Sequence, residues 1–169
     1  IHLEKGMHCI DCHFEQDNHG SGKIYNEARA AIEIDCIDCH GSINGRANLR
    51  TSSFAAPKGG NDLAALRTPW GKRRFEVMGD RIIQRSMVEP DKEWEVSQVA
   101  DSINPASSHY NEKARLAKTI QKDGVSWGTP TGDDKLAHSN NSMTCYACHS
   151  SWITSCFGCP LSMSSNNKK

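Results

Sequence analysis

The stretch Cys9-Ile-Asp-Cys12-His13 decides how this chain is interpreted, because its pattern returns twice more. The second copy is Cys36-Ile-Asp-Cys39-His40, and the third is Cys145-Tyr-Ala-Cys148-His149. A fourth pair, Cys156-Phe-Gly-Cys159, is followed by Pro160 where the other copies have histidine. All eight cysteines of the chain lie in these four pairs, and none is left over.

The spacing of each pair suits covalent attachment of a c-type haem. Two thiols three positions apart can form thioethers with the two vinyl groups at one edge of a porphyrin. The histidine that follows then lies beneath the ring and can bind the iron as its proximal ligand. The proximal ligands expected on this basis are His13, His40 and His149.

Three other interpretations use paired cysteines but leave the histidines unexplained. Zinc sites take ligands from two pairs and need no histidine directly after each second cysteine. A thioredoxin-like redox site has one such pair at the start of a helix, not several copies. A disulfide framework would not require the histidine either. Haem attachment accounts for both the cysteines and the histidines.

Residues 1–41 and 138–160 resemble the multihaem c-type cytochromes, through the CxxCH motifs and the tandem pairs from Cys145 to Cys159. The resemblance implies an electron-transfer protein rather than an enzyme, with closely spaced haem c groups. It also implies export to the periplasm, the outer surface or the extracellular space. The expected partners are redox proteins, such as other cytochromes. A more specific form of this hypothesis is a subunit of a longer haem chain or filament.

Five histidines remain once the proximal ligands are assigned, and we expect them to supply distal ligands. Two imidazoles give a lower potential than imidazole with methionine, so this supply favours low-potential, bis-histidine haems. The distal candidates are His2, His8, His19, His109 and His138. His8 is joined directly to Cys9, so we expect it to serve a haem other than its own. In a filament, His2 could bind a haem of the next subunit.

Pro160 leaves the fourth pair open to three interpretations, because proline offers no side-chain donor to iron. Cys156 and Cys159 can hold a haem with both iron ligands from elsewhere, hold a five-coordinate haem, or stay haem-free. We favour a haem there. A five-coordinate iron would allow a second function, a multihaem reductase of a small oxyanion or of a nitrogen or sulfur compound. The cationic side chains that could serve such a reductase are Arg46, Arg50 and those of residues 72–74.

The composition fits a haem protein and excludes some partners. The chain has 20 basic and 20 acidic side chains, so nothing indicates a nucleic-acid partner. Only 37% of its residues are hydrophobic, which is lean for a packed core, and covalently attached haems would supply the missing apolar surface. No apolar run approaches the roughly 18–20 residues needed to span a bilayer. The first residues read as mature sequence, so we expect the numbering to start at a processed terminus or inside a longer precursor.

The predicted fold is mostly irregular, with a haem core, short helices at the haem sites and a small antiparallel β meander at about 73–99. Phe75 and Val77 alternate with polar residues before the turn signal Gly79-Asp80. A short helix is expected over Asn26–Ile32, and another over Pro105–Gln121 that begins near Ser107 or Ser108.

We therefore divide the chain into four segments, which are expected to form one compact unit. Residues 1–41 are a two-haem module, and residues 138–161 are a C-terminal haem module. Between them, residues 42–137 form an insert without haem motifs, which contains the meander and one helix and supplies distal ligands. Residues 162–169 are a polar tail.

Overall fold

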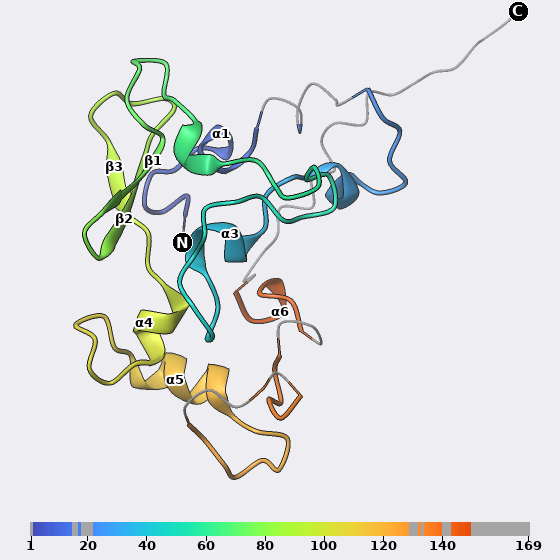
Figure 1. Cartoon of the computed structure of the whole chain (residues 1–169), viewed down its shortest axis with the longest axis vertical. Coiled ribbons are helices and arrows are strands. Elements are labelled where there is room, and N and C mark those ends of the chain that lie inside the picture. The colour runs from blue at the N-terminus through green and yellow to red at the C-terminus, as the bar shows by residue number, and fades with distance from the viewer. Residues whose placement is uncertain are drawn as a thin grey trace, which may run out of the picture.

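The computed structural model describes residues 2–14, 17, 22–128, 132, 134–139 and 143–149, and most of them lie in turns and loops (Figure 1). The short α-helices are α1 (Cys9–Cys12), α3 (Cys36–His40), α4 (Val99–Ile103), α5 (Glu112–Thr119) and α6 (Tyr146–His149). Two 3₁₀ helices span Ala28–Ala31 and Leu63–Ala65. The prediction of little regular secondary structure is confirmed.

The predicted meander is present as a three-stranded antiparallel sheet in the order β1 (Phe75–Met78), β2 (Arg81–Arg85) and β3 (Glu93–Glu95). Gly79 and Asp80 form the turn between the first two strands, because Met78 pairs with Arg81. The central strand β2 is buried on both faces, with Ile82, Ile83 and Gln84 each no more than 5% exposed. The alternation of apolar and polar residues therefore does not by itself predict which β2 side chains are buried.

The described core lies where the sheet meets the two N-terminal motifs. It consists of the buried residues Phe14, Cys39, Leu49, Leu63, Phe75, Ile82 and Val96. Leu49 and Leu63 come from the loop between α3 and β1, and the backbone N–H of Leu63 donates to the carbonyl of Leu49. This core is small and is built from polypeptide side chains, so the haem core stays a prediction.

Two helix predictions differ from the structure. The predicted helix at Asn26–Ile32 is only the 3₁₀ turn of Ala28–Ala31. The predicted helix at Pro105–Gln121 begins later, at Glu112, because the side chain of Asn111 accepts from the N–H of Ala114 and caps it. The Ser107 hydroxyl instead accepts from the N–H of His109, within the preceding turns. The insert also contains α4, which the sequence analysis missed.

Helices α4 and α5 pack against each other away from the sheet, and α6 lies beside α3 in Figure 1. Among the described residues, none of the helices has the length and apolar character needed to cross a membrane.

Candidate functional site

Each of the three described cysteine motifs contains a short helix. Motif 1 (residues 9–13) contains α1, motif 2 (residues 36–40) contains α3, and motif 3 (residues 145–149) contains α6. In motif 1 the N–H of His13 donates to the carbonyl of Cys9 at 2.8 Å, and in motif 3 His149 and Cys145 make the same bond at 2.9 Å. Residues three and four apart share one face of a helix. The two thiols and the histidine of a motif are therefore neighbours.

The six described cysteines are free thiols, so they form no disulfide framework. Burial raises the pKa of Cys12, and it raises the pKa of Cys39 to about 12. Both thiols are therefore protonated at neutral pH. Cys9 and Cys148 are exposed.

A buried aspartate caps the N-terminal end of the helix in each of the first two motifs. Asp11 is 0% and Asp38 is 2% exposed. Each carboxylate accepts a hydrogen bond, 2.7 Å long, from the backbone N–H three residues earlier, which belongs to His8 in motif 1 and Asp35 in motif 2. This contact satisfies a backbone donor at the first turn of the helix. Motif 3 has Ala147 at the equivalent position.

The same two carboxylates also tie the motifs to distant segments. Asp11 accepts from the N–H of Met87 at 2.6 Å. Asp38 accepts from the N–H of Ser52 at 2.9 Å and from its hydroxyl at 2.5 Å. Burial raises the pKa of Asp38, while the hydrogen bonds from Ser52 and Asp35 oppose that shift. Motifs 1 and 2 are thus anchored by the same kind of contact.

Side chains from the sheet hold the carbonyl groups of motif 1. The buried amide of Gln84, in β2, donates to the carbonyl of Asp11. Arg74, immediately before β1, donates from Nη2 to the carbonyl of Ile10 at 2.5 Å. The carbonyls of a four-residue helix have no partners within the helix, so these contacts supply them.

The segment that follows β3 holds motif 2 in a similar way. The side-chain Nε2 of Gln98 donates to the carbonyl of Cys39 at 2.8 Å, and its Oε1 accepts from the N–H of Ala47 at 2.9 Å. His40 Nδ1 lies 2.7 Å from the carbonyl oxygen of Ser97. One small sheet and its flanks therefore fix motif 1 and motif 2 relative to each other.

Two of the three expected proximal histidines have Nδ1 engaged. His40 Nδ1 donates to the carbonyl of Ser97, because a carbonyl can only accept. His13 Nδ1 lies 3.3 Å from the carboxylate of Asp17, whose side chain is 3% exposed. A hydrogen bond at Nδ1 fixes the tautomer and leaves Nε2 to bind a metal. Both imidazoles therefore fit the role of an iron ligand.

His2 lies opposite His40, with their ring centroids 5.9 Å apart and their planes 25° from parallel. The two rings are stacked, whereas an axial ligand points a ring nitrogen at the iron, so the contact shows that the imidazoles are neighbours. Burial and the neighbouring His40 lower the pKa of His2, which favours the neutral imidazole that binds metals. The structure therefore brings the distal candidate His2 beside the proximal candidate His40.

The N-terminal loop carries His2 to this position. The carbonyl of His2 accepts from the N–H groups of Lys5 and Met7, each at 3.1 Å, which closes the loop. The indole of Trp94, in β3, then donates from Nε1 to the carbonyl of Lys5 at 2.9 Å. The sheet therefore positions the distal candidate as well as the two motifs.

The structure does not bring the other distal candidates to a described motif in the same way. His8 Nε2 lies 3.7 Å from a carboxylate oxygen of Glu89, and His109 Nε2 lies 3.2 Å from one of Glu95. His138 has a buried Nδ1 that makes no hydrogen bond to the described residues. His149 is exposed at the end of α6. His19 lies outside the described residues.

Motif 2 is close to both other described motifs. Cys39 belongs to the same core cluster as Phe14, which directly follows motif 1. Cys36 shares a hydrogen bond with Cys145, which links it to motif 3; this contact raises the pKa of Cys36 and lowers that of Cys145 to about 6. Burial raises the pKa of the adjacent Tyr146 to about 12.

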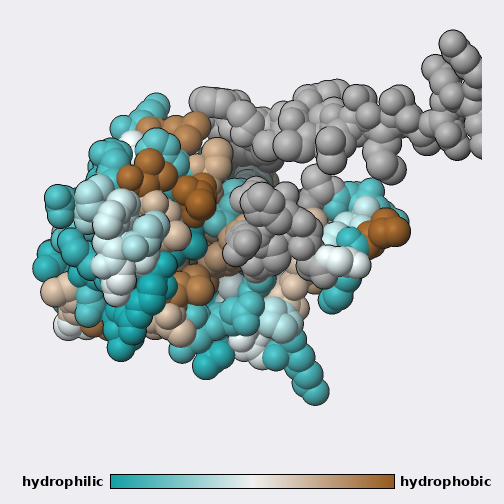
Figure 2. Space-filling model, turned by 90° about the horizontal axis from the view of Figure 1, so that it is seen from above, coloured by the Kyte–Doolittle hydropathy of each residue, from teal (hydrophilic) through white to brown (hydrophobic). Residues whose placement is uncertain are grey.

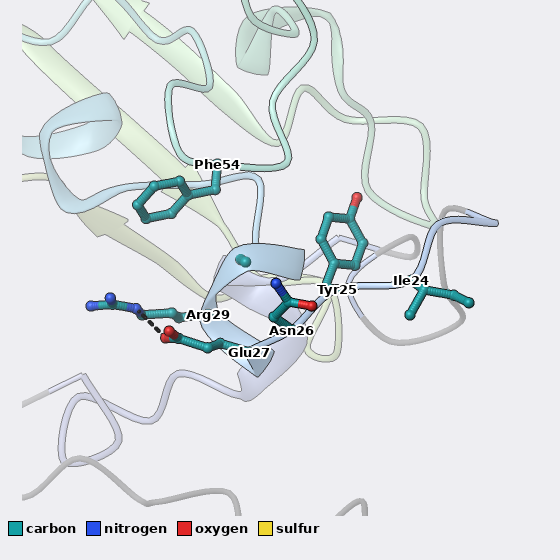
Figure 3. Close-up of a pocket in the computed structure, with 7 residues that line it drawn as sticks. Ile24, Tyr25, Asn26, Glu27, Arg29 and Phe54 are labelled. Carbon is teal, nitrogen blue, oxygen red and sulfur yellow. Dashed lines mark hydrogen bonds and ion pairs between the residues drawn. The ribbon is translucent and has the colours of Figure 1, made fainter.

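A cavity of about 320 Å³ lies away from the predicted site residues. In Figure 3, Arg29 and its partner Glu27 lie on one side of it and Ile24 lies on the other. The guanidinium of Arg29 is 6.0 Å from the centre of the Phe54 ring, and both Phe54 and Ile24 are strongly exposed. In Figure 2 hydrophobic residues reach the surface at several separate places. The cavity contains none of the cysteines or histidines singled out from the sequence.

Several residues that shape the site were missed by the sequence analysis. Asp11 and Asp38 had a readable signal, because both occupy the third position of a Cys-Ile-Asp-Cys repeat. Gln84 and Gln98 had none, since each acts on a motif more than 50 positions away, and Arg74 was considered only as a cation for a reductase. Asp17 follows the first motif closely, but its contact with His13 depends on the loop that follows the motif.

Among the described residues, no three His, Cys, Asp or Glu side chains gather so that they could hold a metal ion by themselves. The fourth pair, Cys156 and Cys159 with Pro160, lies outside the described residues. Compared with known proteins, the chain matches no family model, no curated protein and no solved structure.

Proposed function

We propose that this chain is a multihaem c-type cytochrome that transfers electrons and is not an enzyme. When bound, each haem supplies a reversible one-electron couple at its iron. The chain attaches the haems, supplies iron ligands and fixes the spacing of the sites. The attachment residues are Cys9, Cys12, Cys36, Cys39, Cys145 and Cys148, with a fourth haem at Cys156 and Cys159.

The placement of His2 against His40 is the observation that carries this proposal. Nothing in the sequence between them predicts that the two rings meet, and their stacking brings a second imidazole to motif 2, as a bis-histidine haem needs. His40 has its Nδ1 bonded to Ser97, so Nε2 is the nitrogen left for a ligand. A bis-histidine site keeps its ligands when the iron changes oxidation state, which suits electron transfer.

The contacts between motifs support electron transfer between neighbouring sites. Motif 2 lies against both other described motifs, and the sheet holds motifs 1 and 2 in one frame. Electron transfer needs short and constant distances. The partners on this proposal are exported redox proteins, including other cytochromes. Because His2 lies beside a motif of its own chain, its contact does not depend on a filament.

The reductase alternative rests on an open iron at Cys156 and Cys159, outside the described residues. Two of the cationic side chains considered for it have internal partners. Arg46 pairs with Asp101 at 3.2 Å, and Arg74 is buried against motif 1. Electron transfer therefore remains the function that the site supports best.

The first experiment is the intact mass of the denatured, purified protein, which counts covalent haems. Four haems are expected, and three would mean that Cys156 and Cys159 are not loaded. A chain without covalent haem would overturn the proposal. The same measurement on Cys36→Ser/Cys39→Ser should show the loss of one haem only.

The second experiment tests the ligand pair by spectroscopy of the ferric protein. In His2→Ala, one haem should change from low spin to high spin, because its iron loses one imidazole. Lys5→Ala is the matched control, since the backbone carbonyl that accepts from Trp94 remains. Unchanged low-spin spectra in His2→Ala would show that another residue binds this iron.

A further inference from the structure

Arg74 is a buried cation held against motif 1. It is 4% exposed, and its guanidinium lies 5.2 Å from the ring centre of Phe14 and 5.6 Å from that of Phe75. Nη2 donates to the carbonyl of Ile10 at 2.5 Å, while Nε is buried without a hydrogen-bond partner among the described residues. Burying a guanidinium is costly, so the position calls for an explanation beyond packing.

No carboxylate of the described residues lies within ion-pair distance of this guanidinium. The carboxylate of Asp11 acts on it through space, but its two oxygens accept backbone N–H groups of His8 and Met87. Burial lowers the pKa of Arg74, yet arginine starts from a value so high that it stays charged. The site therefore contains a permanent positive charge that is not neutralised by direct pairing.

The charge lies where motif 1 meets motif 2. Ile10 is inside motif 1, and Phe14 directly follows its histidine. Phe14 and Phe75, the two rings beside the guanidinium, belong to one core cluster with Cys39 of motif 2. The side chain therefore lies close to both motifs.

We propose that Arg74 tunes reduction potential: its buried charge raises the potentials of the haems attached at motifs 1 and 2. The inference rests on the proposed function. Reduction lowers the positive charge at an iron by one unit, so a nearby cation favours the reduced form. The effect is strong in a buried site, where water screens charges weakly.

Arg85 offers a matched control on the same sheet. Its side chain is 16% exposed and bonds to Glu76 at 2.7 Å, to Glu93 at 3.2 Å and to the carbonyl of Arg73, all in or beside the sheet. Solvent therefore reaches this charge and screens it from the motifs. Removing Arg85 should therefore affect the sheet without shifting the potentials of motifs 1 and 2 to more negative values.

The test is a redox titration of the intact, loaded protein, followed by visible absorption. Arg74→Met keeps an apolar stem, Arg74→Gln keeps a donor for the Ile10 carbonyl, and Arg74→Lys keeps the charge. In both neutral variants, part of the titration curve should move to more negative potential. The shift expected is about tenfold in the ratio of reduced to oxidised haem at a fixed potential. The curves of Arg74→Lys and Arg85→Met should stay close to that of the unchanged protein.

The outcomes separate a charge effect from a packing effect. An unchanged curve in either neutral variant overturns the inference, as does a negative shift of equal size in Arg74→Lys. Should neither neutral variant take up haem, the lysine variant decides alone, and its curve must match that of the unchanged protein. Intact masses accompany each titration. Loaded haems without the shift would reject only the role of Arg74, whereas absent haems would reject the proposed function itself.

Discussion

Asp11 and Asp38 occupy the same position in two copies of a motif, but their oxygens meet different donors. In Asp11 each carboxylate oxygen accepts a backbone N–H, one from His8 and one from Met87. In Asp38 one oxygen accepts two backbone N–H groups, and the other faces the Ser52 hydroxyl. A hydroxyl can donate or accept, whereas a backbone N–H can only donate. The same substitution should therefore have different effects on stability at Asp11 and at Asp38.

We predict that Asp11→Asn destabilises the protein and that Asp38→Asn does so much less. An asparagine amide cannot accept from the second N–H at Asp11, so a buried donor is left unsatisfied at a cost of about 1–3 kcal/mol. At Asp38 the new amide can donate to the Ser52 hydroxyl, and the cost should stay below about 1 kcal/mol. Denaturant unfolding of the loaded proteins measures both. Equal losses would contradict this account of the donors.

The contribution of Asp38 to the stability of the protein should also depend on pH. Its folded-state pKa is raised above the ordinary value of 3.8, so the folded state holds a proton more tightly than the unfolded state. The resulting penalty is complete above the raised pKa and fades as the pH falls toward 3.8. The unchanged protein should therefore gain stability relative to Asp38→Asn on acidification. A relative loss over that range would show that the hydrogen bonds outweigh burial.

At this scale the sequence predicted the repeated residues and not their supports. The cysteines and following histidines could be predicted as site residues because the Cys-x-x-Cys-His pattern lies within five consecutive residues. The role of Arg74 could not be predicted, because it depends on the fold bringing the start of β1 against Ile10. Of the distal candidates, His2 meets His40, and Trp94, far along the chain, binds the loop that carries His2.

Among the elements, the end of α3 depends on one glycine. Gly41 directly follows His40 and has φ +65°, and a Cβ there would lie 2.5 Å from the carbonyl oxygen of Gly45 and 2.7 Å from the N of Ala47. Gly79, in the turn between β1 and β2, has the same φ with nothing within 4 Å. Backbone conformation and crowding therefore both require glycine at Gly41, whereas Gly79 has open space around it.

Gly41→Ala should therefore cost clearly more stability than Gly79→Ala. An alanine with positive φ costs about 1–2 kcal/mol at Gly79, and Gly41, with φ +65° and ψ −157°, lies in a region that essentially only glycine adopts. At Gly41 the backbone must also move, which displaces His40 from its partner Ser97. We expect Gly79→Ala to lose about 1 kcal/mol and Gly41→Ala at least twice that, as measured by denaturant unfolding. Similar losses would mean that the loop of residues 42–47 yields easily.

Helix α6 lacks the aspartate that caps the N-terminal ends of α1 and α3, and introducing one at residue 147 should stabilise this helix. In Ala147→Asp the new carboxylate can accept from the N–H of Thr144, as its counterparts do in motifs 1 and 2. The expected gain is about 0.5–1 kcal/mol, seen as slower hydrogen exchange of the α6 amides. Ala106→Asp, which adds the same charge in an exposed turn, is the control. Unchanged exchange at α6 would show that the two motif types differ in more than this residue.

Element prediction succeeded where local signals decided the outcome. Gly79-Asp80 forms the expected hairpin turn, and the meander follows from it. The helix expected from Ser107 starts instead after Asn111, because several capping residues compete over that stretch and tertiary packing selects one. Val77 is 61% exposed although its neighbour in the pattern, Phe75, is fully buried. Only Phe75 meets the core formed with Leu49 and Leu63.

For the whole molecule, the sheet is the frame that joins the N-terminal loop to motifs 1 and 2. Trp94 links β3 to the carbonyl of Lys5, 89 positions earlier in the chain. That contact closes the distance between His2 and His40. Under the proposed function, a change in the sheet should therefore weaken the binding of His2 to the iron even though neither ligand is altered.

We predict that Trp94→Phe raises the high-spin fraction of the ferric protein. The phenyl ring fills much of the same space but cannot donate to Lys5, so the loop is held less firmly and His2 binds for less of the time. The effect should be smaller than in His2→Ala and should fall on the same haem. Trp70→Phe, at an exposed tryptophan, should leave the spectrum unchanged. A spectrum unchanged in Trp94→Phe would show that the loop holds its position without the indole.

Motif 2 lies between the other two described motifs, so the effect of losing a haem on electron transfer depends on which motif loses it. Motif 2 meets motif 1 in the core cluster that contains Cys39 and Phe14, and motif 3 through Cys36, so under the proposed function the described sites form a series circuit. Losing the haem at either end would shorten the conducting path and leave the other two sites connected. Losing the middle haem would break the path into isolated halves. Current through the chain is therefore most vulnerable at residues 36–40.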